Sequence, residues 1–326
     1  MRAAFYERQG PAQEVLQVAD LPAPEPAPGE VRVRLRYSGI NPGDTKKRAG
    51  YFGSAMPYPR VIPHSDGSGI IDRVGDGVSR HRLGQRVWVY NAQSYRAFGT
   101  AAEHTVVPEA TAVALPEEVD DIIGACLGIP GITAHRAVFA DGDVRGKTVL
   151  VHGALGGVGS LAAQLAAWGG ATVITTVRRL ADLSALSGPA AERAVALDGP
   201  DAVDAIREHA PAGVDRIIEV AFSDNVDLDA RVAAGGAVIA AYATREARPR
   251  FDFWPMLFDN LTIRLLGSDD FPTAAKQQAA ADLTSAARDG HLAVTVAPPA
   301  PLTEIAAAHD RVDVDNRRRV LLDLHA

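Results

Sequence analysis

The chain contains a single cysteine, Cys126, among 326 residues. One cysteine excludes an intrachain disulfide and a cysteine-rich zinc lobe, so we expect Cys126 to be a small buried apolar side chain. Runs of apolar residues long enough to cross a bilayer, roughly 18–20 residues, are also missing. Charge interrupts the N-terminal segment before a signal-peptide core can form. These absences predict a soluble, cytoplasmic protein.

The chain has no excess of positive charge either. It has 33 Lys and Arg against 40 Asp and Glu, a formal net charge of −7. Non-specific nucleic-acid binding needs a basic surface, so this class of function is excluded. With 47% hydrophobic residues, a chain of this length predicts two domains with ample cores.

Glycine is concentrated at one informative place, at positions 153, 156, 157 and 159. A strand-like run, 148–151, precedes these glycines, and an apolar-periodic helix, 157–168, follows them. Glycines let backbone N–H groups approach a pyrophosphate, and the helix N-terminus adds partial positive charge. The spacing differs from the strict G-x-G-x-x-G pattern, and glycine loops also form ordinary turns. The strand and helix on either side favour a dinucleotide site.

The two parts of the chain have different patterns. The first third predicts short strands separated by glycine- and proline-bearing turns, at 31–37, 69–74, 86–90 and 104–107. Beyond about residue 125, strands at 148–151, 171–176, 193–197, 215–220, 237–242 and 262–266 alternate with helices at 157–168, 179–187, 200–209, 226–232 and 253–258. This alternation predicts a doubly wound, six-stranded parallel sheet of the Rossmann type.

The last 60 residues predict a polar helix at 273–288, a short strand at 294–296, a helix at 302–311 and a final strand at 320–324. We expect this tail to return to the β-rich domain. The predicted domains are therefore residues 1–124 with 267–326, and residues 125–266.

Ligands of doubly wound sheets lie at the carboxyl ends of the strands. This rule brings together the glycine loop, Thr176–Arg179, Glu219–Phe222 and Tyr242–Thr244 around one crevice.

The end of the second strand bears on the choice of cofactor. NAD-preferring sites hold the ribose 2′-hydroxyl with Asp or Glu at this point, whereas here the strand ends in Thr176, Arg178 and Arg179. A guanidinium could bind the 2′-phosphate of NADP in bidentate fashion. The alternative is a solvated pair of arginines at a helix start, where cations are disfavoured unless an anion is present. The pattern favours NADPH.

Several motifs together resemble one known family along essentially the whole chain. They are Gly39-Ile40-Asn41-Pro42-Gly43-Asp44, the segment 63–69, Gly128-Ile129-Pro130 with Thr133-Ala134, the segment 152–159 and Ile217-Ile218-Glu219. In these motifs the chain resembles the zinc-free, zeta-crystallin-like quinone oxidoreductases of the medium-chain dehydrogenase/reductase superfamily. The resemblance implies a GroES-like β-rich domain plus a Rossmann domain, NADPH in the cleft between them, and a homodimer.

The superfamily also contains zinc alcohol dehydrogenases, in which the positions of Asn41 and Ser65 resemble a cysteine and a histidine ligand. Neither residue replaces a thiolate or an imidazole at a tetrahedral site. His64 lies one residue away, so it would point to the opposite side of an extended segment. We therefore expect no metal.

Without a Lewis acid, a developing alkoxide is poorly stabilised, so plain alcohols and ketones are poor substrates. Quinones and α,β-unsaturated carbonyls delocalise the incoming charge and need mainly orientation and a proton source. We therefore expect a zinc-independent, NADPH-dependent reductase that transfers hydride to a quinone or enone. The alternatives are an enoyl-thioester or specialised-metabolite ene reductase, and an NADPH-binding protein with little turnover.

Several expected site residues have a competing role. Asn41 and Tyr51 are the catalytic candidates, against a turn role for Asn41 and a surface position for Tyr51. Thr133 would contact the cofactor or cap a helix, Tyr242 would contact it or pack in the core, and Arg319 would approach it or be solvated with its arginine neighbours. We treat Glu219 as structural. The complete expected cofactor set is Asn41, Pro42, Asp44, Thr133, Gly153, Ala154, Gly156, Gly157, Val158, Thr176, Arg178, Arg179, Ala221, Tyr242 and Arg319.

Overall fold

The computed structural model describes residues 1–53, 55–314 and 317–326 and forms two compact units. Unit 1 comprises Met1–Pro130, Ala280–Arg288 and Ala293–Ala326, and unit 2 comprises Gly131–Ala279 and Asp289–Leu292. The division at residues 124–125 and 266–267 stays a prediction about the functional domains. No helix in the described ranges has the length and apolar character that a membrane span requires.

Unit 1 contains a seven-stranded sheet of order β14-β15-β3-β4-β5-β7, with β6 paired to β3, and a separate pair β1-β2. Its strands are β1 (Arg2–Phe5), β2 (Gln17–Asp20), β3 (Glu30–Ile40), β4 (Asp66–Val74), β5 (Arg86–Val89), β6 (His104–Pro108), β7 (Ala112–Ala114), β14 (Ala300–Pro301) and β15 (Val320–Asp323). Its helices are α1 (Ala12–Val15), α2 (Pro42–Ala49), α3 (Asp121–Gly124) and α11 (Ile305–Val314).

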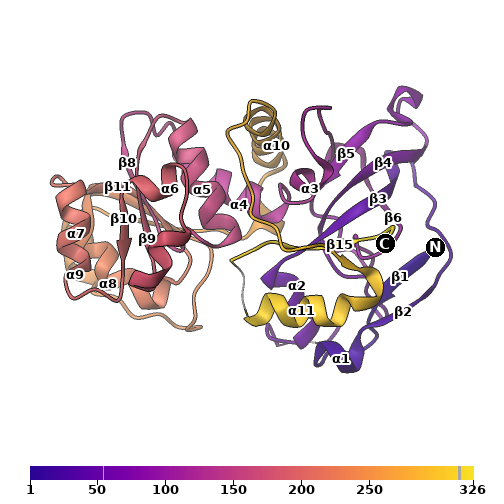
Figure 1. The fold of residues 1–326 in the computed structure, drawn as a ribbon, viewed down its shortest axis with the longest axis horizontal. Helices are drawn as coiled ribbons and strands as arrows, with labels where there is room; N and C mark the ends of the chain where they lie inside the picture. Colours follow the sequence, from indigo (N-terminus) through magenta and orange to yellow (C-terminus); the bar gives the residue numbers. More distant parts are fainter. Residues whose placement is uncertain (54, 315–316) are drawn as a thin grey trace. The chain divides into compact units, whose positions relative to one another are not determined.

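Strand β3 organises unit 1. Val31, Val33 and Leu35 alternate along it and are fully buried, as their spacing predicts for a strand with one core face. The C-terminal β15 pairs antiparallel with β3, which is visible in Figure 1 as a yellow strand beside an indigo one. The tail therefore returns to the β-rich part of the chain, as expected.

Unit 2 contains a parallel six-stranded sheet of order β10-β9-β8-β11-β12-β13. Its strands are β8 (Thr148–Val151), β9 (Thr172–Val177), β10 (Ala194–Ala196), β11 (Val214–Glu219), β12 (Ala233–Ala241) and β13 (Thr262–Leu265). In chain order this arrangement is 3-2-1-4-5-6, the doubly wound order in which the connections reverse between the first and fourth strands. The predicted fold class is confirmed.

Helices cover this sheet. They are α5 (Gly157–Trp168), α6 (Pro189–Glu192), α7 (Ala202–His209), α8 (Phe222–Val232) and α9 (Phe253–Phe258), with α4 (Ile129–Phe139) and α10 (Thr273–Arg288) extending across the unit boundaries. In Figure 1, α5 and α6 lie on one side of the sheet and α7, α8 and α9 on the other. Val149, Leu150 and Val151 are fully buried, because a central parallel strand is covered on both faces.

Three expectations about local structure are wrong. The segment after β3 is helix α2 rather than a loop, because Asn41 and Asp44 form a capping box around Pro42, a residue suited to a first helical turn. Residues 294–296 form no strand, although Val296 makes an isolated bridge to Arg319. The helix expected at 179–187 is a 3-10 helix over Leu180–Ala185.

Candidate functional site

The glycine loop joins β8 to α5 and depends on glycine at two positions. Gly153 has φ +66°, a conformation that favours glycine. A Cβ atom on Gly159 would lie 2.3 Å from the Gly153 carbonyl oxygen, so the first turn of α5 packs directly against the loop. Both positions therefore require glycine, as the sequence pattern indicates.

The start of α5 leaves donors for an anion. Gly156 occupies the N-cap and no side chain caps the helix. The first N–H groups of a helix have no intrahelical acceptor, and here they belong to Gly157, Val158 and Gly159. In contrast, the N–H of Ala154 already donates to the Thr176 carbonyl, and that of Gly156 to the Gly153 carbonyl. The arrangement suits a pyrophosphate at the helix N-terminus.

The residues at the end of β9 do not all face solvent. Arg178 is exposed, and Arg179 pairs with Asp182 at 3.4 Å. Thr176 is fully buried, and its hydroxyl is 2.8 Å from Nδ1 of His152. A direct contact of the Thr176 hydroxyl with a 2′-phosphate does not fit this position, because the side chain is enclosed in the core.

Two more expected residues, Ala221 and Tyr242, follow the ends of β11 and β12. The Ala221 N–H donates to the Glu219 carboxylate at the N-cap of α8, so this donor is already engaged. Tyr242 follows β12, and its N–H donates to the Glu219 carbonyl. Burial and the Glu219 charge raise the pKa of the Tyr242 phenol, which favours its neutral form.

In unit 1, Asn41 is the centre of a buried polar network. Its Nδ2 donates to Asp66 at 2.7 Å, and its Oδ1 accepts from Arg319 at 2.9 Å. Its backbone N–H donates to Asp44 at 2.7 Å. Asn41 thus caps α2 and joins two carboxylates to a guanidinium.

Arg319 is not a solvated member of an arginine trio, which was the alternative to a cofactor contact. It is 7% exposed and also donates to the Ile40 carbonyl.

Burial next to the charge of Asp66 raises the pKa of Asp44 to about 7. The structure therefore brings Asn41, Asp44 and Arg319 together, with Pro42 as the first residue of α2.

Two expected residues lie apart from that network. Tyr51 is 62% exposed just beyond α2, with the Lys46 ammonium 5.2 Å from its ring centre. Thr133 lies in the second turn of α4, which begins at Ile129, so it is not at the helix start as expected.

The residues that correspond to zinc ligands do not fit a zinc ion. Asn41 uses both ends of its amide inside the protein, and Ser65 supplies no thiolate or imidazole. His64 uses Nδ1 toward Ser38 and Nε2 toward His309, at 2.8 and 2.9 Å. Burial raises the pKa of the Cys126 thiol, which favours the protonated form over the thiolate that binds metal.

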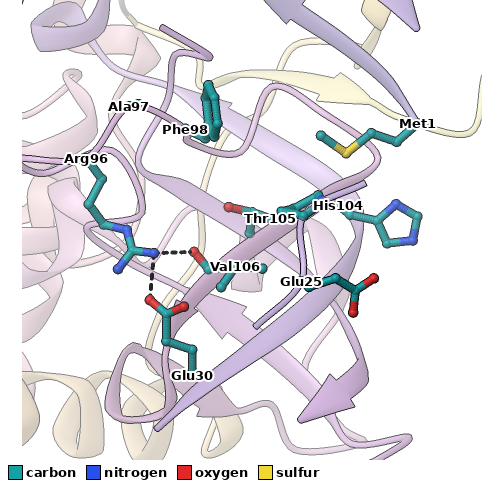
Figure 2. A pocket seen from close by; sticks show the side chains of 10 residues that line it. Met1, Glu25, Glu30, Arg96, Ala97, Phe98, His104, Thr105 and Val106 are labelled. Carbon is teal, nitrogen blue, oxygen red and sulfur yellow. Dashed lines mark hydrogen bonds and ion pairs between the residues drawn. The ribbon is translucent and has the colours of Figure 1, made fainter. Parts of the chain in front are cut away.

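A cavity of about 210 Å³ lies in unit 1 (Figure 2). Arg96 donates across it to Glu30 and to the Val106 carbonyl. Its lining residues are Met1, Pro24, Glu25, Glu30, Arg96, Ala97, Phe98, His104, Thr105 and Val106. None of these is an expected site residue, so the cavity does not coincide with the predicted chemistry.

His152 and Asp229 are two buried residues without a predicted role. Both are fully buried, and His152 Nε2 lies 2.8 Å from Asp229 Oδ1. The sequence signal that could have pointed to His152 is its position between an apolar strand and the glycine loop. Asp229 carried no such signal, since it lies in an ordinary amphipathic helix.

Comparisons with known proteins agree with this architecture. Residues 27–117 match the family described as the alcohol dehydrogenase GroES-like domain. The quinone oxidoreductase of Rattus norvegicus is 41% identical over 183 residues, which cover 54% of this chain and 52% of the rat protein. The similarity thus spans about half the length of that curated relative.

Solved structures match nearly the whole chain. A structure titled as an NAD-dependent alcohol dehydrogenase has a TM-score of 0.86 and 27% identity, and the match covers 99% of this chain and 100% of that one. A putative NADPH:quinone reductase from Bacillus thuringiensis also has a TM-score of 0.86, at 21% identity and with 99% and 98% coverage. The chain is therefore similar in sequence to a quinone oxidoreductase over about half of its length, and similar in fold to an alcohol dehydrogenase and a quinone reductase over nearly all of it.

Proposed function

We propose that this protein is a zinc-independent, NADPH-dependent reductase of quinones or α,β-unsaturated carbonyl compounds. The observation that carries the proposal is the glycine loop that opens into the uncapped N-terminus of α5. The exposed Arg178 at the end of the neighbouring β9 supports NADPH, because a guanidinium matches a 2′-phosphate.

The proposed roles follow from position. The first turn of α5 would hold the pyrophosphate, and Arg178 would hold the 2′-phosphate. Asn41 stays the proposed contact of the nicotinamide ribose or the substrate oxygen, held in place by Asp66 and Arg319. Tyr51 stays a proposed proton donor. A bound reduced nicotinamide supplies the hydride.

Asn41 and Ser65, at the positions that correspond to zinc ligands, favour a metal-independent site. A quinone or enone delocalises the negative charge that it gains, so orientation and a proton replace Lewis-acid stabilisation. We expect activity to survive prolonged dialysis against a chelator. Loss of activity on chelation, with recovery on zinc addition, would contradict this part of the proposal.

The test is NADPH consumption with a panel of quinones, enals, enones and enoyl thioesters. We expect turnover with quinones or simple enones. Turnover confined to enoyl thioesters would assign the second function considered above. Tight NADPH binding without consumption of any acceptor would indicate a binding protein.

The titles of two similar solved structures name different cofactors. One solved structure is titled as an NAD-dependent alcohol dehydrogenase and another as a putative NADPH:quinone reductase. Parallel assays with NADH and NADPH, with ethanol and benzyl alcohol included as oxidation substrates, separate the two. A preference for NADH and an alcohol would overturn the proposal.

A further inference from the structure

Three buried side chains at the carboxyl ends of neighbouring strands and one from a helix form a polar cluster in unit 2. His152 follows β8, Thr176 lies in β9, Glu219 ends β11, and Asp229 comes from α8 (Figure 1 labels these elements). All four are fully buried. Such a cluster is costly to form unless its charges are paired, so its composition needs an explanation.

His152 is the centre of the cluster. Its Nδ1 lies 2.8 Å from the Thr176 hydroxyl, and its Nε2 lies 2.8 Å from Asp229 Oδ1 and 3.6 Å from Glu219 Oε2. Both nitrogens thus face oxygen acceptors, which is the environment that an imidazolium requires. Burial opposes the charge, but the two carboxylates prevail and raise the pKa of His152.

The cluster is joined directly to the glycine loop. His152 immediately precedes Gly153, and its N–H donates to the Ile218 carbonyl in β11. The Ala154 N–H donates to the Thr176 carbonyl in β9. The cluster therefore lies directly beside the backbone of the loop, so its charge lies close to the place where an anion would bind.

The charges of the cluster do not balance when every group is ionised. One imidazolium faces two carboxylates, which leaves a net charge of −1 in the core. Asp229 Oδ2 has no hydrogen-bond donor among the described residues. Glu219 accepts from the Ala221 N–H and from Asn225, and Tyr242 is the other titratable group close to it. No lysine or arginine offsets this charge in the described surroundings of His152 and Glu219.

The excess charge is relieved by one proton. Burial and the charge of Asp229 raise the pKa of Glu219 to about 7, although His152 opposes the shift. Near neutral pH the cluster therefore exists in two forms that differ by one proton. An anion at the adjacent loop is repelled by the charged form and accepted by the neutral one.

We propose that the His152–Glu219–Asp229 cluster takes up a proton when a dinucleotide binds to the glycine loop, so that cofactor affinity falls as pH rises through neutrality. His152 and Glu219 are then positioning residues that act on the loop without touching the ligand. The inference rests on the proposed function and adds a regulation of the same site. Thr176 would act through His152 rather than through a phosphate.

A metal ion shared by His152, Glu219 and Asp229 is the competing explanation for the cluster, because the possible ligand atoms of these residues lie within 4.8 Å of one another. A zinc ion would lie about 2.0–2.2 Å from each nitrogen and oxygen ligand and would separate them. The 2.8 Å contact between His152 and Asp229 is a hydrogen bond instead. Elemental analysis of the purified protein belongs in the test, and one bound metal ion per chain would overturn the proposal.

The experiment is calorimetric titration of NADPH into the full chain at pH 7.5 in PIPES and in Tris. These buffers differ in ionisation enthalpy, so the difference in binding heat gives the number of protons taken up. We compare the wild type with Glu219→Gln and Asp229→Asn, and use Glu192→Gln on the exposed face of α6 as the matched control. The 2′-phosphate of NADPH titrates alike in every variant and cancels from the comparison.

We expect the wild type and Glu192→Gln to take up about half a proton more than Glu219→Gln at this pH. The Kd of the wild type should rise about three- to tenfold more between pH 6.5 and 8.5 than that of Glu219→Gln. Asp229→Asn should also take up less, because Glu219 without its acidic neighbour stays ionised beside His152.

Equal proton uptake in all four proteins would overturn this proposal while leaving the proposed function in place. Failure of the wild type to bind any dinucleotide would remove the proposed function and this inference together. If Glu219→Gln fails to fold, Asp229→Asn decides by the same comparison.

Discussion

Some side chains that were expected to contact the cofactor form hydrogen bonds with other side chains of the protein. Asn41 and Arg319 were proposed for the cofactor, and the structure shows them bonded to each other and to Asp66. Thr176, proposed for a phosphate, bonds to His152 instead. A sequence shows which residue ends a strand, but it does not show which way the side chain points.

Arg178 is the residue on which the choice of NADPH depends. We expect Arg178→Ala to raise the Kd for NADPH about tenfold or more and to leave that for NADH nearly unchanged, because a charge-assisted hydrogen bond is lost. Fluorescence titrations with both cofactors measure the ratio. The partly exposed Arg193→Ala serves as a control, and equal losses for the two cofactors would disprove the 2′-phosphate assignment.

Asp44 predicts a pH dependence of stability. Its folded pKa of about 7 lies above the ordinary 3.8, so the folded state keeps a proton that the unfolded state loses, and stability falls as pH rises from about 4 to 7. Asp44→Asn keeps an acceptor for the Asn41 N–H without this cost. We expect the variant to be about 2 kcal/mol more stable than the wild type at pH 8 and to lose this advantage at pH 4.

Denaturant unfolding at the two pH values measures the Asp44 effect, with the exposed Asp76→Asn as a control. A variant less stable than the wild type at pH 8 would show that the carboxylate itself stabilises the α2 cap.

At the scale of elements, the sequence located strands and helices best where apolar periodicity was strong. Strand 148–151 and helices 157–168, 253–258 and 273–288 have the expected bounds. Helix α2 was missed although Asn41, Pro42 and Asp44 form a typical helix start, because Asn-Pro also begins turns. The run 294–296 has strand-like residues but gains only one bridge, since strand formation depends on a partner elsewhere in the chain.

A buried histidine pair joins the segment before β4 to α11, and no local sequence pattern revealed it. His64 precedes β4 and adopts φ +76°, and its Nε2 meets Nε2 of His309 in α11. Burial lowers the pKa of both rings, that of His309 to about 3. Both rings are therefore neutral in the folded protein at neutral pH.

This pair predicts acid sensitivity. The folded pKa values lie below the ordinary 6.5, so the unfolded state binds more protons below that pH, and stability is lost as pH falls from 6.5 toward 3. The loss approaches about 1.4 kcal/mol per pH unit for each histidine. We expect the Tm of His309→Gln to fall less steeply between pH 6.5 and 4.5 than that of the wild type. The exposed His81→Gln should follow the wild type, and identical slopes in all three would disprove this origin.

At the scale of the whole molecule, unit 2 has an exposed apolar edge. β13 is an edge strand of the sheet, and Leu265 is 76% exposed on it. In neighbouring α9, Trp254 and Phe258 are 65% and 73% exposed. Unprotected apolar edge strands invite pairing with another chain, so we propose that a second copy covers this edge in a homodimer.

Light scattering on a sizing column tests the homodimer. We expect the wild type to have twice the 34.3 kDa chain mass, and Leu265→Lys combined with Phe258→Glu to shift toward the monomer. Lys147→Glu on the surface of the same unit is a charge-change control. A monomeric wild type, or an unchanged dimer in the double variant, would contradict this arrangement.

The overall architecture was the most predictable feature, because the alternation of strands and helices depends on spacing rather than on individual contacts. Residues whose roles depend on distant partners were the least predictable. Arg319 and His309 meet their partners across more than 240 positions of sequence. Their burial could not be deduced from neighbouring residues.

The glycine loop of unit 2 is the proposed NADPH site, on which the proposed function depends. Equilibrium titration of NADPH into the wild type and Gly159→Ala tests it most directly, because the added Cβ would collide with the Gly153 carbonyl oxygen. Gly267→Ala, where a Cβ meets nothing within 4 Å, is the matched control. We predict one site per chain in the wild type and control, and a Kd raised at least tenfold in Gly159→Ala. No binding by the wild type, or equal binding by all three, would contradict the claim.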